Sequence, residues 1–375
     1  MACDRCGEAR AEGSRYCAFC GEEQRDDCPD CDAFRSGGAL YCGSCGKRLG
    51  HPPVQRPTEP GSDISLAKKL CLVMVPIAAL LLIAEFCFMI GGTFTVFDWC
   101  ATQSMNILGL VPNLVILTTI SGTALQVAWL LIEASVILSL ALVAYQTWKG
   151  MSEEGRAEEK IEKTPLFGIG YMFAAMMAVN IIIMVVNMIF GKSIEIPDGM
   201  DTGNTPAALL EFADAAVWEE VISRLVPIGI PMAIVALANR KKGWPAYILG
   251  GFGLSKLAVA LILISSLMFG FAHMSGWGIL KVAPTFFTGM MMGWLYCRFG
   301  IHASIAFHFL VDYLAVISYT GLQIPVSLAT LVVMAVGFVA LGLIILGLRS
   351  IREDVKALPD WMPDQESIFC RRGSD

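Results

Sequence analysis

The feature that most constrains this chain is a series of apolar stretches of about 20 residues that begins at Leu70. A helix of this length crosses the hydrocarbon core of a bilayer, which is about 30 Å thick. The sequence therefore predicts an all-α, multi-pass membrane helix bundle with about eight transmembrane helices over residues 70–347. The stretches lie near residues 70–91, 125–148, 166–190, 208–238, 246–272, 280–297, 301–320 and 324–347.

One further apolar stretch, Ala101–Gly122, is interrupted by residues that disfavour helices. It contains Gly109, Pro112 and Asn113; proline removes a backbone donor, and glycine weakens a helix. We therefore expect a re-entrant or interfacial segment here, with seven or nine spans as the alternatives to eight.

The positive charges of the chain gather in alternate loops. Lys and Arg concentrate in the cytoplasmic loops of membrane proteins, whereas residues 91–124 contain neither. The charge rule therefore places the protein in the cell membrane with both termini in the cytoplasm. The charges that decide this are Lys68, Lys69, Lys149, Arg156, Lys160, Lys163, Arg240, Lys241, Lys242, Arg298, Arg349, Arg352 and Lys356.

The first 45 residues hold eight of the 13 cysteines, in two units that repeat at an offset of 25. Each unit offers two Cys-x2-Cys pairs, whose four thiolates suit a tetrahedral structural zinc site. We therefore predict a double zinc ribbon over residues 1–49 with two structural zinc ions. A disulfide-stapled extracellular module is the alternative, and the polar start of the chain favours a reducing cytoplasm instead. The predicted zinc ligands are Cys3, Cys6, Cys17, Cys20, Cys28, Cys31, Cys42 and Cys45.

The segments on either side of the apolar body are polar. Residues 50–69 are predicted to be a Pro-rich linker, and residues 348–375 a cytoplasmic tail. The net charge of −6 argues against nucleic acid as a partner, because nucleic acid is bound by clustered basic surfaces. We expect the lipid bilayer to surround the body and a protein partner to bind the ribbons, and the sequence does not predict an oligomeric state.

Ionisable side chains inside membrane spans are costly and are therefore candidates for function. Three of the predicted spans carry such side chains at short spacings. Counted along the spans, they fall in the same half of the membrane, so one internal pocket could hold them all. The candidate catalytic residues are Glu219, Glu220 and Arg224 in the fourth span, His273 at the end of the fifth, and His308 and Asp312 in the seventh.

The spacing within these spans brings charges together. Glu220 and Arg224 are one helical turn apart, as are His308 and Asp312, so each pair can interact on one helix face. Pro227 follows in the fourth span and is expected to bend it, because proline removes an amide donor.

Three residues outside this set also carry expectations. His302 lies off the helix face of His308, and we expect it at the membrane interface. Gly289 and Gly293 are one turn apart and permit close helix contact. We expect this contact within the bundle, with a contact across a dimer as the alternative.

The polar residues resemble a known family. The order Glu-Glu-x3-Arg, Phe-x3-His and His-x3-Asn/Asp on successive helices is similar to the CPBP intramembrane proteases, which include the CAAX prenyl endopeptidases and bacteriocin-processing enzymes. Here the resemblance covers about residues 206–318, with Phe269 as the aromatic residue of the second motif. It implies an endopeptidase in which Glu219 and His273 hold and deprotonate a water molecule.

The resemblance also implies roles for the other residues. Glu220 and Arg224 would form the ion pair that fixes the helix, and His308 with its partner would face the oxyanion. The chain departs from the commoner asparagine of the family at Asp312, and an ionised carboxylate would repel an oxyanion. Asp312 would therefore be protonated, orient His308 or bind a metal.

The membrane site leaves two routes open. Glu219, His273, His308 and Asp312 would make a mixed nitrogen and oxygen site for a catalytic zinc ion. We favour the metal-free route, in which Glu219 and His273 act directly.

Two functions from different classes follow from these patterns. The first is an intramembrane endopeptidase that acts on a membrane-associated, lipid-modified peptide or protein, with the zinc ribbons recruiting a partner or substrate. The second is a non-catalytic membrane scaffold or regulatory protein in which the ribbons bind partners. Substitution of Glu219 separates the two, because it matters only for the enzyme.

Overall fold

The chain divides into two units, Met1–Ser65 and Leu66–Asp375, and the fold described here is that of the second. The computed structural model describes residues 62–111, 113–192, 204–318, 323–363 and 369. The eight cysteines of the predicted zinc ribbons and most of the predicted linker lie outside the described residues.

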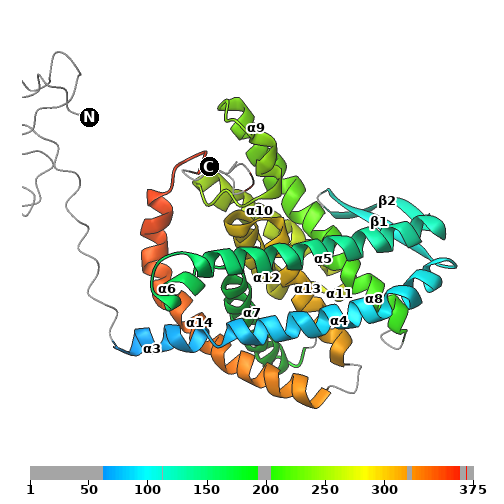
Figure 1. The fold of residues 1–375 in the computed structure, drawn as a ribbon, viewed down its shortest axis with the longest axis horizontal. Coiled ribbons are helices and arrows are strands. Elements are labelled where there is room, and N and C mark those ends of the chain that lie inside the picture. The colour runs from blue at the N-terminus through cyan, green and yellow to red at the C-terminus, as the bar shows by residue number, and fades with distance from the viewer. Residues whose placement is uncertain (1–61, 112, 193–203, 319–322, 364–368, 370–375) are drawn as a thin grey trace, which may run out of the picture. The chain divides into compact units, whose positions relative to one another are not determined.

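The second unit consists mainly of helices (Figure 1). The described helices are α3 (Ser62–Cys71), α4 (Met74–Cys100), α5 (Thr123–Ser152), α6 (Ala157–Ile161), α7 (Pro165–Ile189), α8 (Thr205–Asp214), α9 (Ile230–Ala238), α10 (Lys256–Ala272), α11 (Met274–Trp277), α12 (Val282–Phe299), α13 (Ile301–Ser318) and α14 (Gln323–Ala357). Short 3₁₀ turns occupy η3 (Trp244–Leu249) and η4 (Ile279–Lys281).

Six of the described helical stretches are long and apolar enough to cross a membrane, so the predicted multi-pass helical bundle is confirmed in kind. The two predicted spans outside this set correspond to α12 and α13. The apolar part of α13, Ile301–Val316, is shorter than the others, and α12 contains hydroxyl side chains and Arg298. The six are Leu66–Cys100, Thr123–Ser152, Pro165–Ile189, Thr205–Ala238, Lys256–Trp277 and Ile324–Gly347.

The interrupted apolar stretch forms a β-hairpin, so the prediction of an all-α chain is wrong at this point. Strand β1 (Ser104–Val111) pairs antiparallel with β2 (Asn113–Ser121). The segment is rich in Val, Ile and Thr, whose branched side chains suit strands. The register changes between Ile107 and Leu108, where β2 carries one extra residue, Leu117, as in a β-bulge.

The helix that spans Thr205–Ala238 is continuous but irregular. Between α8 and α9 lie two π-helical segments, η1 (Ala215–Glu219) and η2 (Val221–Gly229). Pro227 lies inside η2, where its missing N–H and its ring disturb the regular hydrogen-bond ladder, as expected from the sequence. Single π-helical turns in α-helices are frequent at functional sites.

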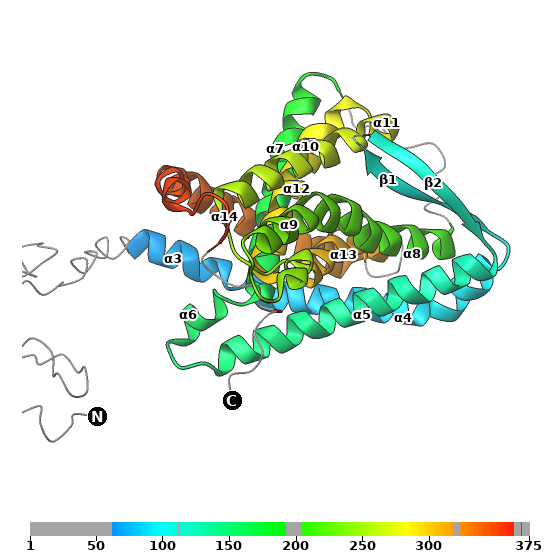
Figure 2. The same cartoon turned by 90° about the horizontal axis from the view of Figure 1, so that it is seen from above.

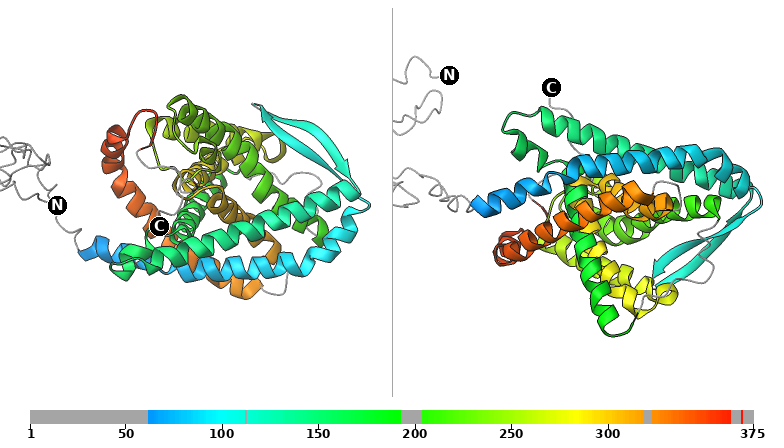
Figure 3. Two further views of the ribbon diagram at one scale, coloured as in Figure 1. Left: turned by 45° about the horizontal axis from the view of Figure 1, so that its top comes forward. Right: turned by 90° about the horizontal axis from the view of Figure 1, so that it is seen from below.

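Helix α13 lies at the centre of the second unit. It contacts α4, α5, α7, α8, α12 and η1, and nearly every side chain over residues 302–310 is buried. Two of these neighbours, α4 and α5, lie side by side and are joined by the hairpin (Figures 2 and 3). The core is thus arranged around the helix that carries His308.

Helices α10 and α12 pack closely through small residues. A side-chain carbon at Gly293 would lie 2.9 Å from Ile262 Cγ2, and one at Gly289 would lie 3.2 Å from Ser266 Cα. Both glycines therefore allow the two backbones to approach. This confirms the predicted contact within the bundle.

The described part of the predicted tail packs back on the bundle. Helix α14 continues to Ala357, and the chain then meets the start of α10. Lys256 N–H donates to Pro359 O (2.9 Å), and Lys256 Nζ lies 2.7 Å from Asp360 Oδ1. These contacts satisfy donors at the N-terminus of α10, which begins at Lys256 rather than near residue 246.

His302 is buried within the protein, and its expected position at the membrane interface stays a prediction. Its exposed fraction is 2%, and Phe369 covers its ring edge-on at 5.8 Å between centroids. Among the described residues, neither of its ring nitrogens has a hydrogen-bond partner. The tertiary contact with a distant residue buries it, which spacing within the helix does not reveal.

Candidate active site

The six candidate catalytic residues converge from three helices that are separated in sequence. Glu219 is the last residue of η1, Glu220 follows it directly, and Arg224 lies in η2. His273 follows the last residue of α10, and His308 and Asp312 lie on α13. All six belong to one continuous set of contacts, so the structure brings together every candidate that the sequence singled out in the membrane body.

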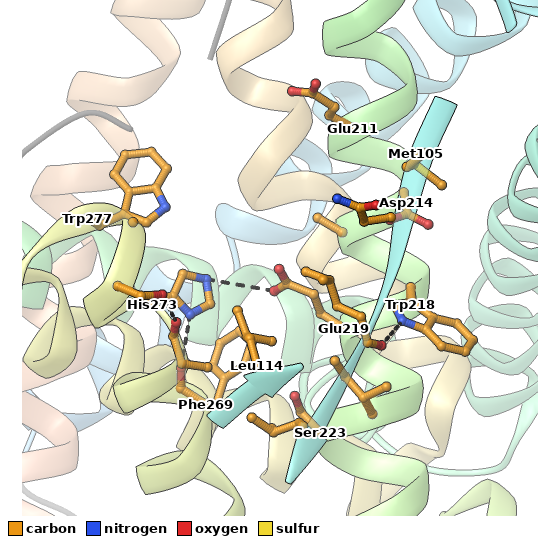
Figure 4. A pocket seen from close by; sticks show the side chains of 18 residues that line it. Met105, Leu114, Glu211, Asp214, Trp218, Glu219, Ser223, Phe269, His273 and Trp277 are labelled. Carbon is orange, nitrogen blue, oxygen red and sulfur yellow. Dashed lines mark hydrogen bonds and ion pairs between the residues drawn. The ribbon is translucent and has the colours of Figure 1, made fainter. Parts of the chain in front are cut away.

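Glu219 and His273 face each other across a pocket (Figure 4). The distance from Glu219 Oε2 to His273 Nε2 is 3.8 Å, which is longer than a direct hydrogen bond. His273 Nδ1 lies 2.9 Å from Phe269 O, so this nitrogen donates its hydrogen to the carbonyl and leaves Nε2 toward Glu219. Both side chains keep partial exposure, 30% and 19% respectively, so a third oxygen can reach both groups from the pocket.

Behind this pair lies a fully buried polar network. Arg224 Nε is 3.4 Å from Glu220 Oε2, and neither side chain is exposed. Glu220 also accepts hydrogen bonds from Ser304 Oγ and from His308 Nδ1, the latter at 3.0 Å. Arg224 Nη1 donates to Ser265 Oγ at 2.9 Å. The two buried charges are therefore paired with each other and with neighbouring polar groups, as buried ions require, although Arg224 Nε has no hydrogen-bond partner among the described residues.

Ser265 and Ser304 were not predicted from the sequence. Ser304 precedes His308 by four residues on α13, so it shares the helix face that carries the catalytic candidates. That spacing is a usable signal for Ser304. Ser265 is one of two adjacent serines in an apolar helix, and nothing in its local sequence points to Arg224.

His308 lies among three carboxylates. Its Nδ1 faces Glu220, whereas its Nε2 is 3.3 Å from Asp312 Oδ2 and 3.7 Å from Glu219 Oε2. Of the roles considered for Asp312, this geometry matches an acceptor that orients the imidazole ring. His308 thereby connects the buried ion pair to the pocket carboxylate.

Two cavities meet at His273 and Phe269. The larger, about 300 Å³, is lined by Glu219 and by residues of the hairpin. The smaller, about 100 Å³, is lined by His308, Asp312 and Lys281 among others. The larger cavity is mostly apolar with a few polar groups, which is typical of ligand sites.

Lys281 adds a positive charge next to the smaller cavity. It lies in η4, between the candidate spans, and its Nζ is 4.3 Å from the centre of the Trp277 ring. Burial lowers the pKa of Lys281, while the negative charges of Asp312 and Glu219 act in the opposite direction. No spacing in the sequence singles out Lys281.

The remaining polar residues beside the spans have separate surroundings. Glu211 and Asp214 line the larger cavity. Glu133 accepts a hydrogen bond from Thr93. Glu85 is fully buried, and neither of its carboxyl oxygens has a hydrogen-bond partner among the described residues.

A catalytic zinc ion would need Glu219, His273, His308 and Asp312 to direct their donor atoms to one point. Within the residues that the structure describes, no group of three or more His, Cys, Asp or Glu side chains has an arrangement that could hold a metal ion. His308 directs one ring nitrogen to Glu220 and the other to Asp312. The catalytic zinc ion therefore stays a prediction, and the reaction proposed for this site uses the side chains alone.

Comparison with known proteins bears on this same segment. Searches of curated proteins and of solved structures found no match. Residues 202–314 match the model of a family described as Type II CAAX prenyl endopeptidase Rce1-like. The match covers less than a third of the chain and includes all six candidate catalytic residues. The segment that carries the candidate site is therefore similar to the Rce1-like CAAX prenyl endopeptidases, which supports the predicted relation to the CPBP proteases.

Proposed function

We propose that this multi-pass membrane protein is an endopeptidase that hydrolyses a peptide bond of a membrane-associated, lipid-modified substrate. The observation that carries the proposal is the approach of Glu219 Oε2 to two imidazoles, 3.8 Å from His273 Nε2 and 3.7 Å from His308 Nε2, where two adjoining cavities meet. The similarity of residues 202–314 to prenyl endopeptidases supports it.

The proposed reaction uses a water molecule between Glu219 and His273. Glu219 removes a proton from the water while His273 Nε2 orients it, and the water oxygen forms a bond to the substrate carbonyl carbon. The resulting oxyanion faces the Nε2 side of His308. Glu219 then transfers the proton to the amide nitrogen as the carbon–nitrogen bond breaks, which releases an amine and a carboxyl product.

The buried network holds these groups in place. Glu220 binds His308 through Nδ1 and pairs with Arg224, so it fixes both the ring of His308 and the helix that carries Glu219. A preorganised arrangement of this kind lowers the cost of reorganisation during the reaction.

The proposal is tested with purified protein in liposomes and two synthetic substrates. One is a peptide with an S-farnesylated cysteine three residues before its C-terminus, and the other is an unlipidated peptide with one membrane span. Mass spectrometry of the products identifies any cleaved bond. Cleavage of the farnesylated peptide that requires Glu219 supports the proposal. Folded protein that cleaves neither peptide would favour the scaffold function instead.

Asp312 is proposed to act by orienting His308. Replacing Asp312 with Asn should retain most of the activity, because Asn Oδ1 still accepts a hydrogen bond from His308 Nε2. Replacing it with Ala should lower kcat by about 10- to 100-fold, the usual range for a lost hydrogen bond to a charged group. Hydrolysis of the farnesylated peptide measures both, and equal losses in the two variants would contradict the orienting role.

The predicted double zinc ribbon, residues 1–49, is proposed to hold two structural zinc ions and to bind a protein partner in the cytoplasm, where we place both termini. Elemental analysis of the purified chain should find about two zinc ions, one for each predicted four-thiolate unit. Cys17→Ser should reduce the content to about one. The control is Cys87→Ser, because Cys87 is an exposed cysteine of α4 outside the repeat. Zinc-free protein with oxidised cysteines would indicate the disulfide module.

A further inference from the structure

The β-hairpin borders the pocket that holds the catalytic candidates. Met105, Asn106, Leu108 and Leu110 of β1 line the same cavity as Glu219. The hairpin runs from the ends of α4 and α5 to α11 (Figure 2), and one strand passes Asp214 and Glu219 in the close view (Figure 4). A strand edge and a candidate general base therefore share one cavity of about 300 Å³.

Two hydrogen bonds, one just before β1 and one within it, show which backbone groups face the pocket. Gly122 N–H donates to Gln103 O at 3.2 Å, so position 103 is bonded to the partner strand. Trp218 Nε1–H donates to Leu108 O at 2.6 Å, so this carbonyl points away from β2. The extra residue of the bulge belongs to β2, so the alternation along β1 continues without a break. Asn106 therefore directs its backbone N–H and C=O to the same side as Leu108.

We propose that the substrate binds in an extended conformation as a third strand along this outer edge of β1. The inference rests on the proposed function and specifies how that site takes its substrate. A peptide bond within a helix is shielded by the helix itself, whereas an extended segment exposes its carbonyl to attack. In apolar surroundings such a segment must satisfy its backbone groups. The edge of β1 supplies the N–H and C=O of Asn106 next to the Leu108 carbonyl that Trp218 binds.

Trp218 fixes this edge relative to the catalytic carboxylate. Its indole N–H holds the carbonyl of Leu108, and its neighbour in the chain is Glu219. The position of β1 is thus tied to the helix turn that carries the general base. A third strand on β1 would be placed in a defined register with Glu219, which makes Trp218 a positioning residue.

Proline substitutions can test the role of the pocket-facing edge of the hairpin separately from that of its opposite edge. Asn106 and Thr119 are paired across the hairpin, and Thr119 Oγ1 donates to Asn106 Oδ1 at 2.7 Å. Asn106→Pro and Thr119→Pro both remove this bond, but only the first removes a backbone donor that faces the pocket. Proline is tolerated where the lost N–H points away from the partner strand. We expect Asn106→Pro to raise KM for the farnesylated peptide about five- to tenfold, and Thr119→Pro to leave it within about twofold.

A second measurement leaves the protein unchanged and does not need hydrolysis. A series of the same farnesylated peptide carries a benzophenone group and one N-methyl amide, moved along the chain one residue at a time. Photocrosslinking to the Glu219→Gln variant reports binding. We expect the crosslinking yield to fall at every second methylated position, because amides of a bound strand alternate toward and away from β1.

The outcomes distinguish this inference from the proposed function. A period of two in the crosslinking series, lost when Asn106→Pro is added to the Glu219→Gln variant, supports strand binding even if the wild-type protein hydrolyses no peptide. Hydrolysis that is equally insensitive to Asn106→Pro and Thr119→Pro, with a flat N-methyl series, overturns strand binding and leaves the endopeptidase intact. Failure of every peptide to crosslink to β1 also overturns it.

Discussion

Replacing Glu219 with Gln is expected to lower kcat for the farnesylated peptide by about 10²- to 10⁴-fold, the contribution typical of a positioned general base. Gln has nearly the same shape as Glu but cannot accept a proton from water. Its amide still reaches the pocket opposite His273, which lies 3.8 Å away in the native protein. The loss should therefore affect kcat more than KM. Rates measured in liposomes at several peptide concentrations separate the two constants.

A matched control for this variant is Glu85→Gln. Glu85 is another buried acidic residue of a membrane span, but it does not line the cavity that contains Glu219. We expect its activity to stay within a few-fold of the wild type. Full hydrolysis by folded Glu219→Gln protein would overturn the role of Glu219 as the general base.

Replacing Arg224 with Met is expected to reduce the free energy of unfolding by about 3–5 kcal/mol, the usual cost of leaving one partner of a buried ion pair unpaired. Glu220 would then be a buried carboxylate that keeps bonds only to Ser304 and His308. The double variant Glu220→Gln with Arg224→Met removes both charges and should recover much of this loss. Unfolding of the detergent-solubilised protein, followed by circular dichroism, measures both variants.

The exposed ion pair between Lys256 and Asp360 provides the comparison. Its side chains are 44% and 70% exposed, and exposed pairs contribute about 0–1 kcal/mol. Lys256→Met should therefore change stability far less than Arg224→Met. Equal effects of the two substitutions would show that the membrane network does not depend on compensation of buried charge. The double variant Glu220→Gln with Arg224→Met should remain inactive even where it is stable, because His308 loses the carboxylate of Glu220.

Much of the candidate site is visible in the sequence because its key contacts are local or belong to short motifs. Glu220 and Arg224 are four residues apart, as are His308 and Asp312, and helix geometry alone brings such residues together. The cost of burying charges in a membrane makes them stand out against an apolar background. The resemblance of the three motifs to one family then suggests that the pairs meet.

Other parts of the site could not be predicted in this way. Ser265 contacts Arg224 across two helices, and a serine is common enough in membrane helices to carry little information. The hairpin was expected to be a re-entrant or interfacial segment, because hydropathy measures polarity and does not distinguish a strand from a helix. His302 is buried by Phe369, a contact over a long sequence separation.

The sequence by itself determined the membrane bundle and the candidate catalytic residues, because length, hydropathy and helical spacing are properties of a single segment. Only the tertiary structure decided that Glu219 meets both His273 and His308 where two cavities adjoin and that the edge of β1 lines the larger of them. These arrangements depend on how α10, α13 and the irregular helix pack against each other. Packing is set by the combined shape of many side chains, and no single segment encodes it.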